Sequence, residues 1–135
     1  MITLIDTNIL LDIFGADPKF GHASSKMLRK CLKEGAVHAC EIVWAETATA
    51  FPNPILFKQS MDTLSIEFSA MSEESALLAA KAWHHYRLNG GKRERVIADF
   101  LIGAHASLQG KRLLTRDRGF YRKYFKSLSI LDPSA

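Results

Sequence analysis

Short apolar runs alternate with longer amphipathic stretches along this chain. Residues 2–5 are mostly apolar and match a short buried strand, while 8–14 match a helix capped by Asp6 or the residue after it. In the stretch 20–34 apolar residues recur at helical spacing, and Gly35 is suited to end that helix. The remaining pattern predicts further strands at 36–40, 64–68, 112–115 and 127–131, and further helices at 41–51, 55–63, 73–88 and 96–108.

This alternation of short apolar strands with helices is typical of parallel βαβ units. Right-handed crossovers then give an α/β fold, a three-layer α/β/α sandwich with a central, mostly parallel sheet. The chain has no internal repeat, low-complexity stretch or long linker, so residues 1–135 are expected to form one domain. In such sheets the functional side chains lie beyond the carboxyl ends of the strands.

The composition narrows the class of protein. The 135 residues are 47% hydrophobic and 24% charged, which excludes a disordered chain. No apolar run reaches the length of a membrane span, and the N-terminus lacks the basic region of a signal peptide, so we expect a soluble, cytoplasmic protein. Cys31 and Cys40 belong to no CxxC or zinc pattern and are interpreted as reduced structural thiols.

Positive charge gathers toward the C-terminus. From residue 92 onward there are 10 Lys and Arg against 4 Asp and Glu, whereas residues 1–91 hold 8 and 10. A basic field on a small domain suggests a polyanionic partner such as a nucleic acid, because Lys and Arg favour phosphate backbones. An ordinary solvated surface explains the charge alone equally well.

Four acidic residues stand out by their positions. Asp6 ends the first strand and Asp117 follows the strand at 112–115 by two residues, so both emerge at the same edge of a parallel sheet. Glu46 and Asp99 lie inside apolar helical stretches, where an unpaired carboxylate is costly to desolvate. Glu41 competes with Glu46, but an acid at a helix start is unremarkable, so Glu46 is preferred.

If these carboxylates converge, their repulsion must be offset. Two carboxylates about 4 Å apart cost about 4 kcal/mol at an effective dielectric constant of about 20. Protonation or a divalent cation can relieve this repulsion, and oxygen-only ligands favour Mg²⁺ or Mn²⁺. Such ions promote hydrolysis of phosphodiesters. An acidic, metal-binding site beside a basic surface is therefore suited to cutting a nucleic-acid backbone.

Four segments together resemble the successive motifs of one enzyme family: LIDTNILLD (4–12), WAETATAF (44–51), RVIADFLIGAHA (95–106) and LLTRDRGFYRKYF (113–125). The chain is similar to PIN-domain nucleases, and most similar to the VapC-type ribonuclease toxins of type II toxin–antitoxin systems. The resemblance implies a PIN-like fold and a catalytic, metal-binding cluster with two polar supports: Asp6, Glu46, Asp99 and Asp117, supported by Asn8 and Thr115.

The resemblance also implies an activity and partners. It suggests a Mg²⁺- or Mn²⁺-dependent endoribonuclease that forms a homodimer and is inhibited by a cognate VapB-type antitoxin. The alternatives are a PIN-domain nuclease of RNA maturation or decay and a non-catalytic RNA-binding or regulatory module. A phosphatase or dehalogenase-like hydrolase is disfavoured because it needs a second aspartate where this chain has Asn8.

Basic residues near the last two acids are candidate RNA contacts. They are Arg93, Arg95, Arg116 and Arg118, with Arg122 and Lys123 further along. Aromatic residues interleave with them, and these either stack unpaired bases or pack in the core as part of a terminal helix: Tyr121, Tyr124 and Phe125. Trp44 and Trp83 are interpreted as core or partner-contact residues, and His105 as structural.

Overall fold

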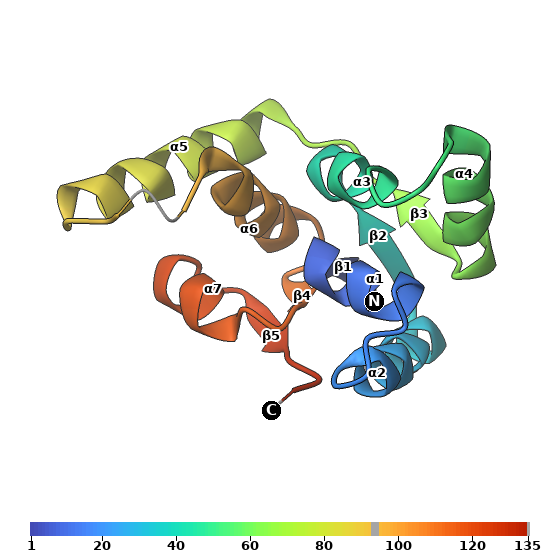
Figure 1. Ribbon diagram of the computed structural model, residues 1–135. Coiled ribbons are helices and arrows are strands. Elements are labelled where there is room, and N and C mark those ends of the chain that lie inside the picture. The colour runs from blue at the N-terminus through green and yellow to red at the C-terminus, as the bar shows by residue number, and fades with distance from the viewer. Residues whose placement is uncertain (93–94, 135) are drawn as a thin grey trace.

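In the computed structural model, which describes residues 1–92 and 95–134, five strands form one sheet in which every pairing is parallel. The spatial order is β3-β2-β1-β4-β5, so the N-terminal strand is central (Figure 1). The strands are β1 (Ile2–Ile5), β2 (Ala36–Ala39), β3 (Ile66–Phe68), β4 (Arg112–Leu114) and β5 (Ser129–Leu131). The helices are α1 (Thr7–Phe14), α2 (Gly21–Glu34), α3 (Glu41–Ala48), α4 (Pro54–Thr63), α5 (Glu73–Leu88), α6 (Ile97–Gln109) and α7 (Arg118–Tyr124).

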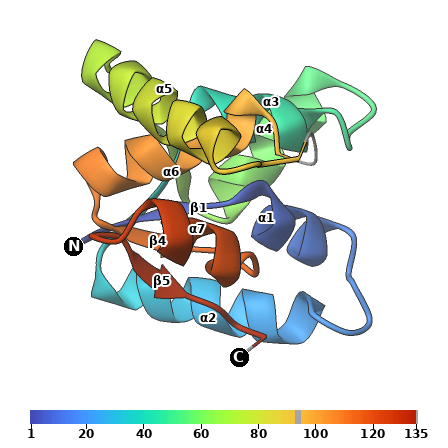
Figure 2. The same ribbon diagram turned by 90° about the vertical axis from the view of Figure 1, so that its left-hand side faces the viewer.

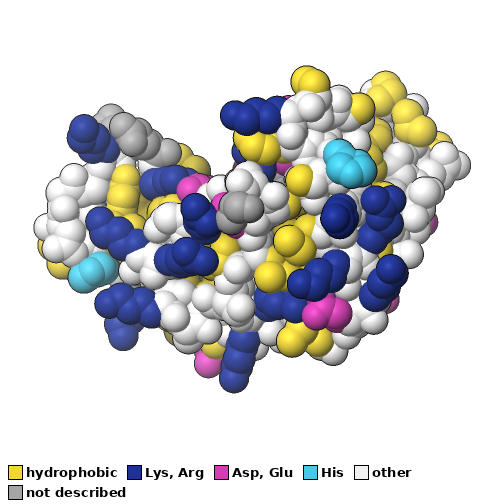
Figure 3. Space-filling view, turned by 90° about the horizontal axis from the view of Figure 1, so that it is seen from below, with side chains coloured by type: hydrophobic (Ala, Val, Ile, Leu, Met, Phe, Trp, Pro, Cys, Tyr) yellow, Lys and Arg dark blue, Asp and Glu magenta, His cyan; other side chains and the backbone are white. Residues whose placement is uncertain are grey.

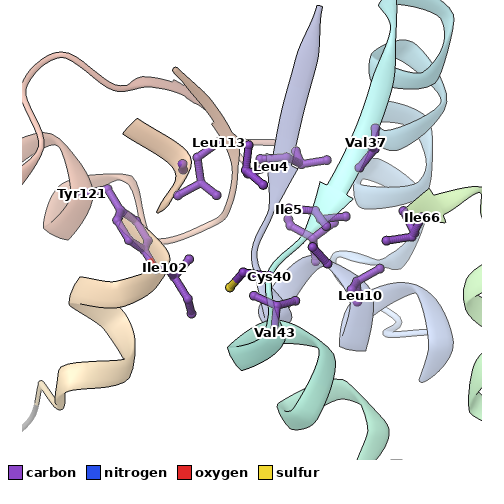
Figure 4. Close-up of a cluster of buried hydrophobic side chains, with 14 of the residues drawn as sticks. Leu4, Ile5, Leu10, Val37, Cys40, Val43, Ile66, Ile102, Leu113 and Tyr121 are labelled. Atoms are coloured by element: carbon purple, nitrogen blue, oxygen red, sulfur yellow. The ribbon is translucent and has the colours of Figure 1, made fainter. Parts of the chain in front are cut away.

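Helices cover both faces of the sheet. Figure 2 shows α2 on one side and α6 on the other, with α5 packed outside α6. Leu4, Ile5 and Val37 lie at the centre of the core, and Tyr121 of α7 lies at its edge (Figure 4). The predicted α/β sandwich is therefore confirmed, and its sheet is wholly parallel within the described residues.

Local chemistry explains where the helices begin. Asp6, Asn53 and Ser72 are N-caps whose side chains accept hydrogen bonds from backbone amides, at 2.8, 2.8 and 3.1 Å. Gly103 lets α6 approach the chain after α7, because a Cβ there would lie 2.4 Å from the ring of Phe125.

The predicted element boundaries need small corrections. The strand expected at 64–68 begins at Ile66, because Ser65 has a φ of 59° and turns the chain out of α4. The helix expected at 41–51 ends at Ala48, ahead of Pro52, and the strand expected at 127–131 begins at Ser129. Among the described residues, no helix has the length and apolar character needed to cross a membrane.

Candidate active site

Two neighbouring strands bring distant parts of the chain together at one edge of the sheet. β1 and β4 are paired with Ile5 opposite Leu114, so the residues that follow each strand lie side by side. The backbone amide of Asp6 donates to the carbonyl of Leu114 at 3.0 Å, and the hydroxyl of Thr115 donates to the Asp6 carboxylate at 2.8 Å. The topology therefore places Asp6 beside Thr115, as expected for the carboxyl ends of parallel strands.

Asp6 is buried, with 6% of its surface exposed. One carboxylate oxygen accepts from the Thr7 amide at 2.8 Å; the other accepts from Thr115 and from the hydroxyl of Tyr121 at 3.1 Å, with the Asn8 amide at 3.4 Å. Burial raises the pKa of Asp6 to about 6, although the hydrogen bonds from Thr115, Thr7 and Tyr121 oppose this shift. All four donors are neutral groups, so no cationic side chain hydrogen-bonds to this carboxylate among the described residues.

Asp99 lies in the first turn of α6, where it accepts a hydrogen bond from the Val96 amide at 3.4 Å. Partial burial raises its pKa, and the negative charges of Asp117 and Glu46 raise it further, while Arg95 lowers it. The charge of Asp99 in turn raises the pKa of Asp6. Asp99 therefore interacts electrostatically with each of the other three predicted acids.

Glu46 and Glu41 have different surroundings. Glu46 is exposed on α3 and accepts a hydrogen bond from the Thr7 hydroxyl at 2.6 Å, next to Asp6. Glu41 instead accepts the backbone amide of Met71 at 3.0 Å and ties the segment after β3 to the start of α3. His105 is buried and pairs with the Ser69 hydroxyl at 3.0 Å.

Asp117 is held by Arg95. Both terminal nitrogens of the guanidinium hydrogen-bond to the carboxylate, one of them at 3.1 Å. The guanidinium also lies over the ring of Phe120, 4.4 Å from its centroid. The hydrogen bonds that Arg95 donates to Asp117 raise the pKa of Arg95. The two residues form an ion pair in which each side chain is about a third exposed, 30% and 33%.

Arg116 forms a similar ion pair, with Asp12 of α1. Its guanidinium donates to Asp12 at 2.7 and 2.9 Å and lies over the ring of Phe20, 4.1 Å from its centroid. Its backbone amide donates to the Asn8 side chain at 3.2 Å. Although the sequence suggests Arg116 as a phosphate contact, its side chain links α1 to the start of α2.

The other predicted RNA contacts differ in exposure. Arg118 is exposed and lies 3.6 Å from Asp132, and Arg93 lies outside the described residues. Figure 3 shows that Lys and Arg side chains crowd the face over α2 and α7, with few acidic side chains among them. On α2 four exposed bases follow one another at helical spacing: Lys26, Arg29, Lys30 and Lys33. The charge count along the sequence did not reveal this second basic surface.

Sequence reasoning also missed Asp12 and the hydroxyl of Tyr121. Asp12 lies within an apolar helical stretch, as Asp99 does, so the same criterion could have found it. Tyr121 was interpreted only through its ring, but a buried tyrosine hydroxyl usually has a polar partner. Here that partner is Asp6.

The donor set suits a hard divalent cation, because Asp99 is close enough to Asp6 to raise its pKa and the available donors are oxygens. In the present side-chain positions, however, the described residues include no group of three or more His, Cys, Asp or Glu side chains arranged to hold a metal ion. Asp117 faces Arg95, and Glu46 faces Thr7. The carboxylates therefore suit a divalent cation by their donor atoms and their charge, but their present side-chain positions do not form a complete coordination site.

Comparisons with known proteins identify the family and the fold of this chain. The PIN domain family model matches residues 3–126, whereas no curated protein matches the sequence. The fold is similar to those of VapBC2 from Rickettsia felis, solved bound to a DNA fragment from their promoter (TM-score 0.76, 18% identity, 98% of each chain covered), VapBC-1 from nontypeable Haemophilus influenzae (0.74, 19%, 100% of each chain) and FitAcB from Neisseria gonorrhoeae (0.69, 23%, 98% of each chain). Since the family model matches most of the length of this chain, the chain belongs to the PIN domain family.

Proposed function

We propose that this PIN-domain protein is a divalent-metal-dependent endoribonuclease. The observation that carries the proposal is the gathering of acids from separate segments near Asp99, whose pKa is raised by burial and also by the charges of Asp117 and Glu46, and whose own charge raises the pKa of Asp6. Membership of a nuclease family and the basic surface over α2 and α7 support a nucleic-acid substrate. Asp6, Glu46, Asp99 and Asp117 are the proposed ligands of Mg²⁺ or Mn²⁺.

The surrounding residues then have distinct tasks. Thr115, Asn8 and Tyr121 orient the Asp6 carboxylate through hydrogen bonds to one of its oxygens. A divalent cation held by the acids would offset the charge that develops on a phosphodiester during attack by water. Arg95, which holds Asp117, and Arg118, which lies near Asp132, are proposed contacts of the RNA backbone. Arg93, Arg122 and Lys123 stay candidate contacts.

A toxin role with a VapB-type antitoxin is the proposed biological setting. The three solved neighbours above are VapBC and FitAcB proteins, and the chain matches them over 98–100% of its length. By analogy we propose a cytoplasmic homodimer that an antitoxin inhibits. An RNA-maturation or RNA-decay nuclease with the same fold is the second candidate, because the acid cluster would serve either role.

Cleavage of RNA by the purified chain tests the chemistry. A labelled single-stranded RNA should be cut internally in Mg²⁺ or Mn²⁺ and left intact after chelation. Asp99→Asn should lower the rate by about 10³-fold or more, because it removes negative charge at the centre of the cluster. Glu41→Gln is the matched control, since Glu41 lies on the same sheet edge but bonds to Met71.

Two results would contradict the nuclease proposal: cleavage by Asp99→Asn at the wild-type rate, or cleavage that persists without divalent ions. The toxin role needs a separate test. Induced expression of the wild-type chain should arrest growth and create new RNA ends, and expression of Asp6→Asn should do neither. Growth without arrest, together with cleavage in vitro, would favour the maturation or decay role.

A further inference from the structure

A groove of about 580 Å³ lies between the C-terminal half of α5 and the start of α6. Its lining residues are Trp83, Tyr86, Arg87, Gly91, Lys92, Arg95, Val96 and Ile97. The volume of the groove falls within the range of small-molecule binding sites. None of the residues discussed as metal ligands lines it, so it is a feature separate from the acid cluster.

The lining combines aromatic rings with positive charge. Trp83 and Tyr86 offer the rings, and the Arg87 guanidinium lies 5.4 Å from the centre of the Trp83 ring. Tyr86 donates its hydroxyl hydrogen bond to the Lys92 carbonyl, which fixes one wall. No acidic side chain is among the lining residues that the structure describes. Rings flanked by cations are the features with which proteins hold unpaired nucleotides.

The groove adjoins the acid cluster at two points. Arg95 lines the groove and its guanidinium holds the carboxylate of Asp117. Val96 lines the groove and its backbone amide donates to Asp99 at 3.4 Å. A strand of RNA with one phosphate at the acids would therefore have a neighbouring nucleotide close to the groove.

We propose that this groove binds one unpaired nucleotide of the RNA next to the bond that is cut. The base would lie against Trp83, and the adjoining phosphates would lie near Arg87 and Lys92. The proposal rests on the proposed nuclease function of the acid cluster. The cations among the described lining residues, with no acidic side chain beside them, favour the RNA backbone as the occupant of the groove. Stacking accepts any base, so we expect a preference for single strands rather than for a sequence.

Tryptophan fluorescence can test this directly, because the chain has two tryptophans. Trp44 packs edge-on against Phe57 and Phe68 and does not line the groove, so Trp44→Phe leaves Trp83 as the reporter. In chelator, where no cleavage occurs, a short single-stranded RNA should quench Trp83 emission in a saturable way. Trp83→Phe is the matched control: its remaining Trp44 should not respond to the same RNA.

The contribution of stacking and of charge can then be separated. Trp83→Ala should raise the KM for single-stranded RNA by about 5- to 100-fold with little change in kcat, and Trp83→Phe should recover much of the loss. Arg87→Ala should weaken binding and lower the dependence of log Kd on log salt by about one. Circular dichroism and thermal melting of each variant show whether it is folded.

Binding of labelled RNA, followed by anisotropy, distinguishes the outcomes. RNA that binds and is cut without changing Trp83 emission, with an unaltered KM for Trp83→Ala, would overturn the groove proposal and leave the nuclease proposal intact. Trp83 emission that depends on protein concentration alone would assign the groove to a second copy and overturn it too. RNA that neither binds nor is cut would instead contradict the proposed function itself.

Discussion

Two arginine–aspartate pairs flank Asp6, and they share a design but differ in burial. Arg116 binds Asp12 and lies over Phe20; Arg95 binds Asp117 and lies over Phe120. The Asp12 side chain is only 5% exposed, whereas that of Asp117 is 33% exposed. The same kind of ion pair therefore has a buried carboxylate at Asp12 and a partly exposed one at Asp117.

The difference in burial gives the two pairs different consequences. A buried carboxylate that loses its partner cannot regain water, so removing Arg116 leaves a charge that burial strongly disfavours. A half-exposed carboxylate can be solvated again, so removing Arg95 affects stability little. We call Arg116 with Asp12 the inner pair and Arg95 with Asp117 the outer pair. We infer that the inner pair fixes the fold around α1 and that the outer pair sets the charge balance of the acid cluster.

The largest expected effect follows from breaking the inner pair. Arg116→Ala should lower the free energy of unfolding by about 3 kcal/mol, because Asp12 would keep only the Ser24 hydroxyl at 2.9 Å as a side-chain donor. Urea unfolding measures this change.

The double variant Asp12→Leu with Arg116→Met should recover most of the lost stability, since apolar residues of similar volume often replace a buried ion pair without loss. A change below about 0.5 kcal/mol for Arg116→Ala alone would show that burial does not separate the two pairs.

Asp6 extends the comparison to an acid without an arginine. Its pKa is raised from 3.8 to about 6, so its ionised form destabilises the fold above pH 6, and this destabilisation is absent below about pH 3.8. Asp6→Asn should therefore raise the free energy of unfolding near pH 7.5 by about 2 kcal/mol, after allowing about 1 kcal/mol for the hydrogen bonds from Thr115 and Tyr121 that an amide nitrogen cannot accept.

The stabilisation of Asp6→Asn should shrink as the pH falls through 6 toward 4, which unfolding curves across that range can follow in metal-free buffer. Thr49→Ala is a suitable control, because its exposed hydroxyl bonds only to the Glu46 carbonyl and does not contact Asp6. A gain for Asp6→Asn that is equal at pH 4 and pH 7.5 would contradict the raised pKa.

The sequence predicted which elements bring the acidic residues together better than it predicted which arginine pairs with which aspartate. Asp6 and Asp117 could be placed at one edge because parallel strands present their carboxyl ends together, which short apolar runs followed by acids already indicate. The partners of Arg95 and Arg116 could not be predicted, because each depends on how side chains from separate elements meet. The bases of α2 were hidden for a related reason: net charge along the chain ignores which residues share a face.

The smallest effect on stability is expected at the outer pair. Arg95→Ala should change the free energy of unfolding by less than about 1 kcal/mol, because both partners are partly exposed. The same substitution should nevertheless strengthen the binding of Mn²⁺ several-fold, as measured by calorimetry. Asp117 would lose the positive charge of the Arg95 guanidinium, so the acid cluster would gain net negative charge. Arg118→Ala is the matched control, since Arg118 lies beside Asp117 in sequence but faces Asp132. Equal Mn²⁺ affinity for Arg95→Ala and wild type would mean that this ion pair does not govern the charge of the site, and the contrast with the inner pair would then be one of stability alone.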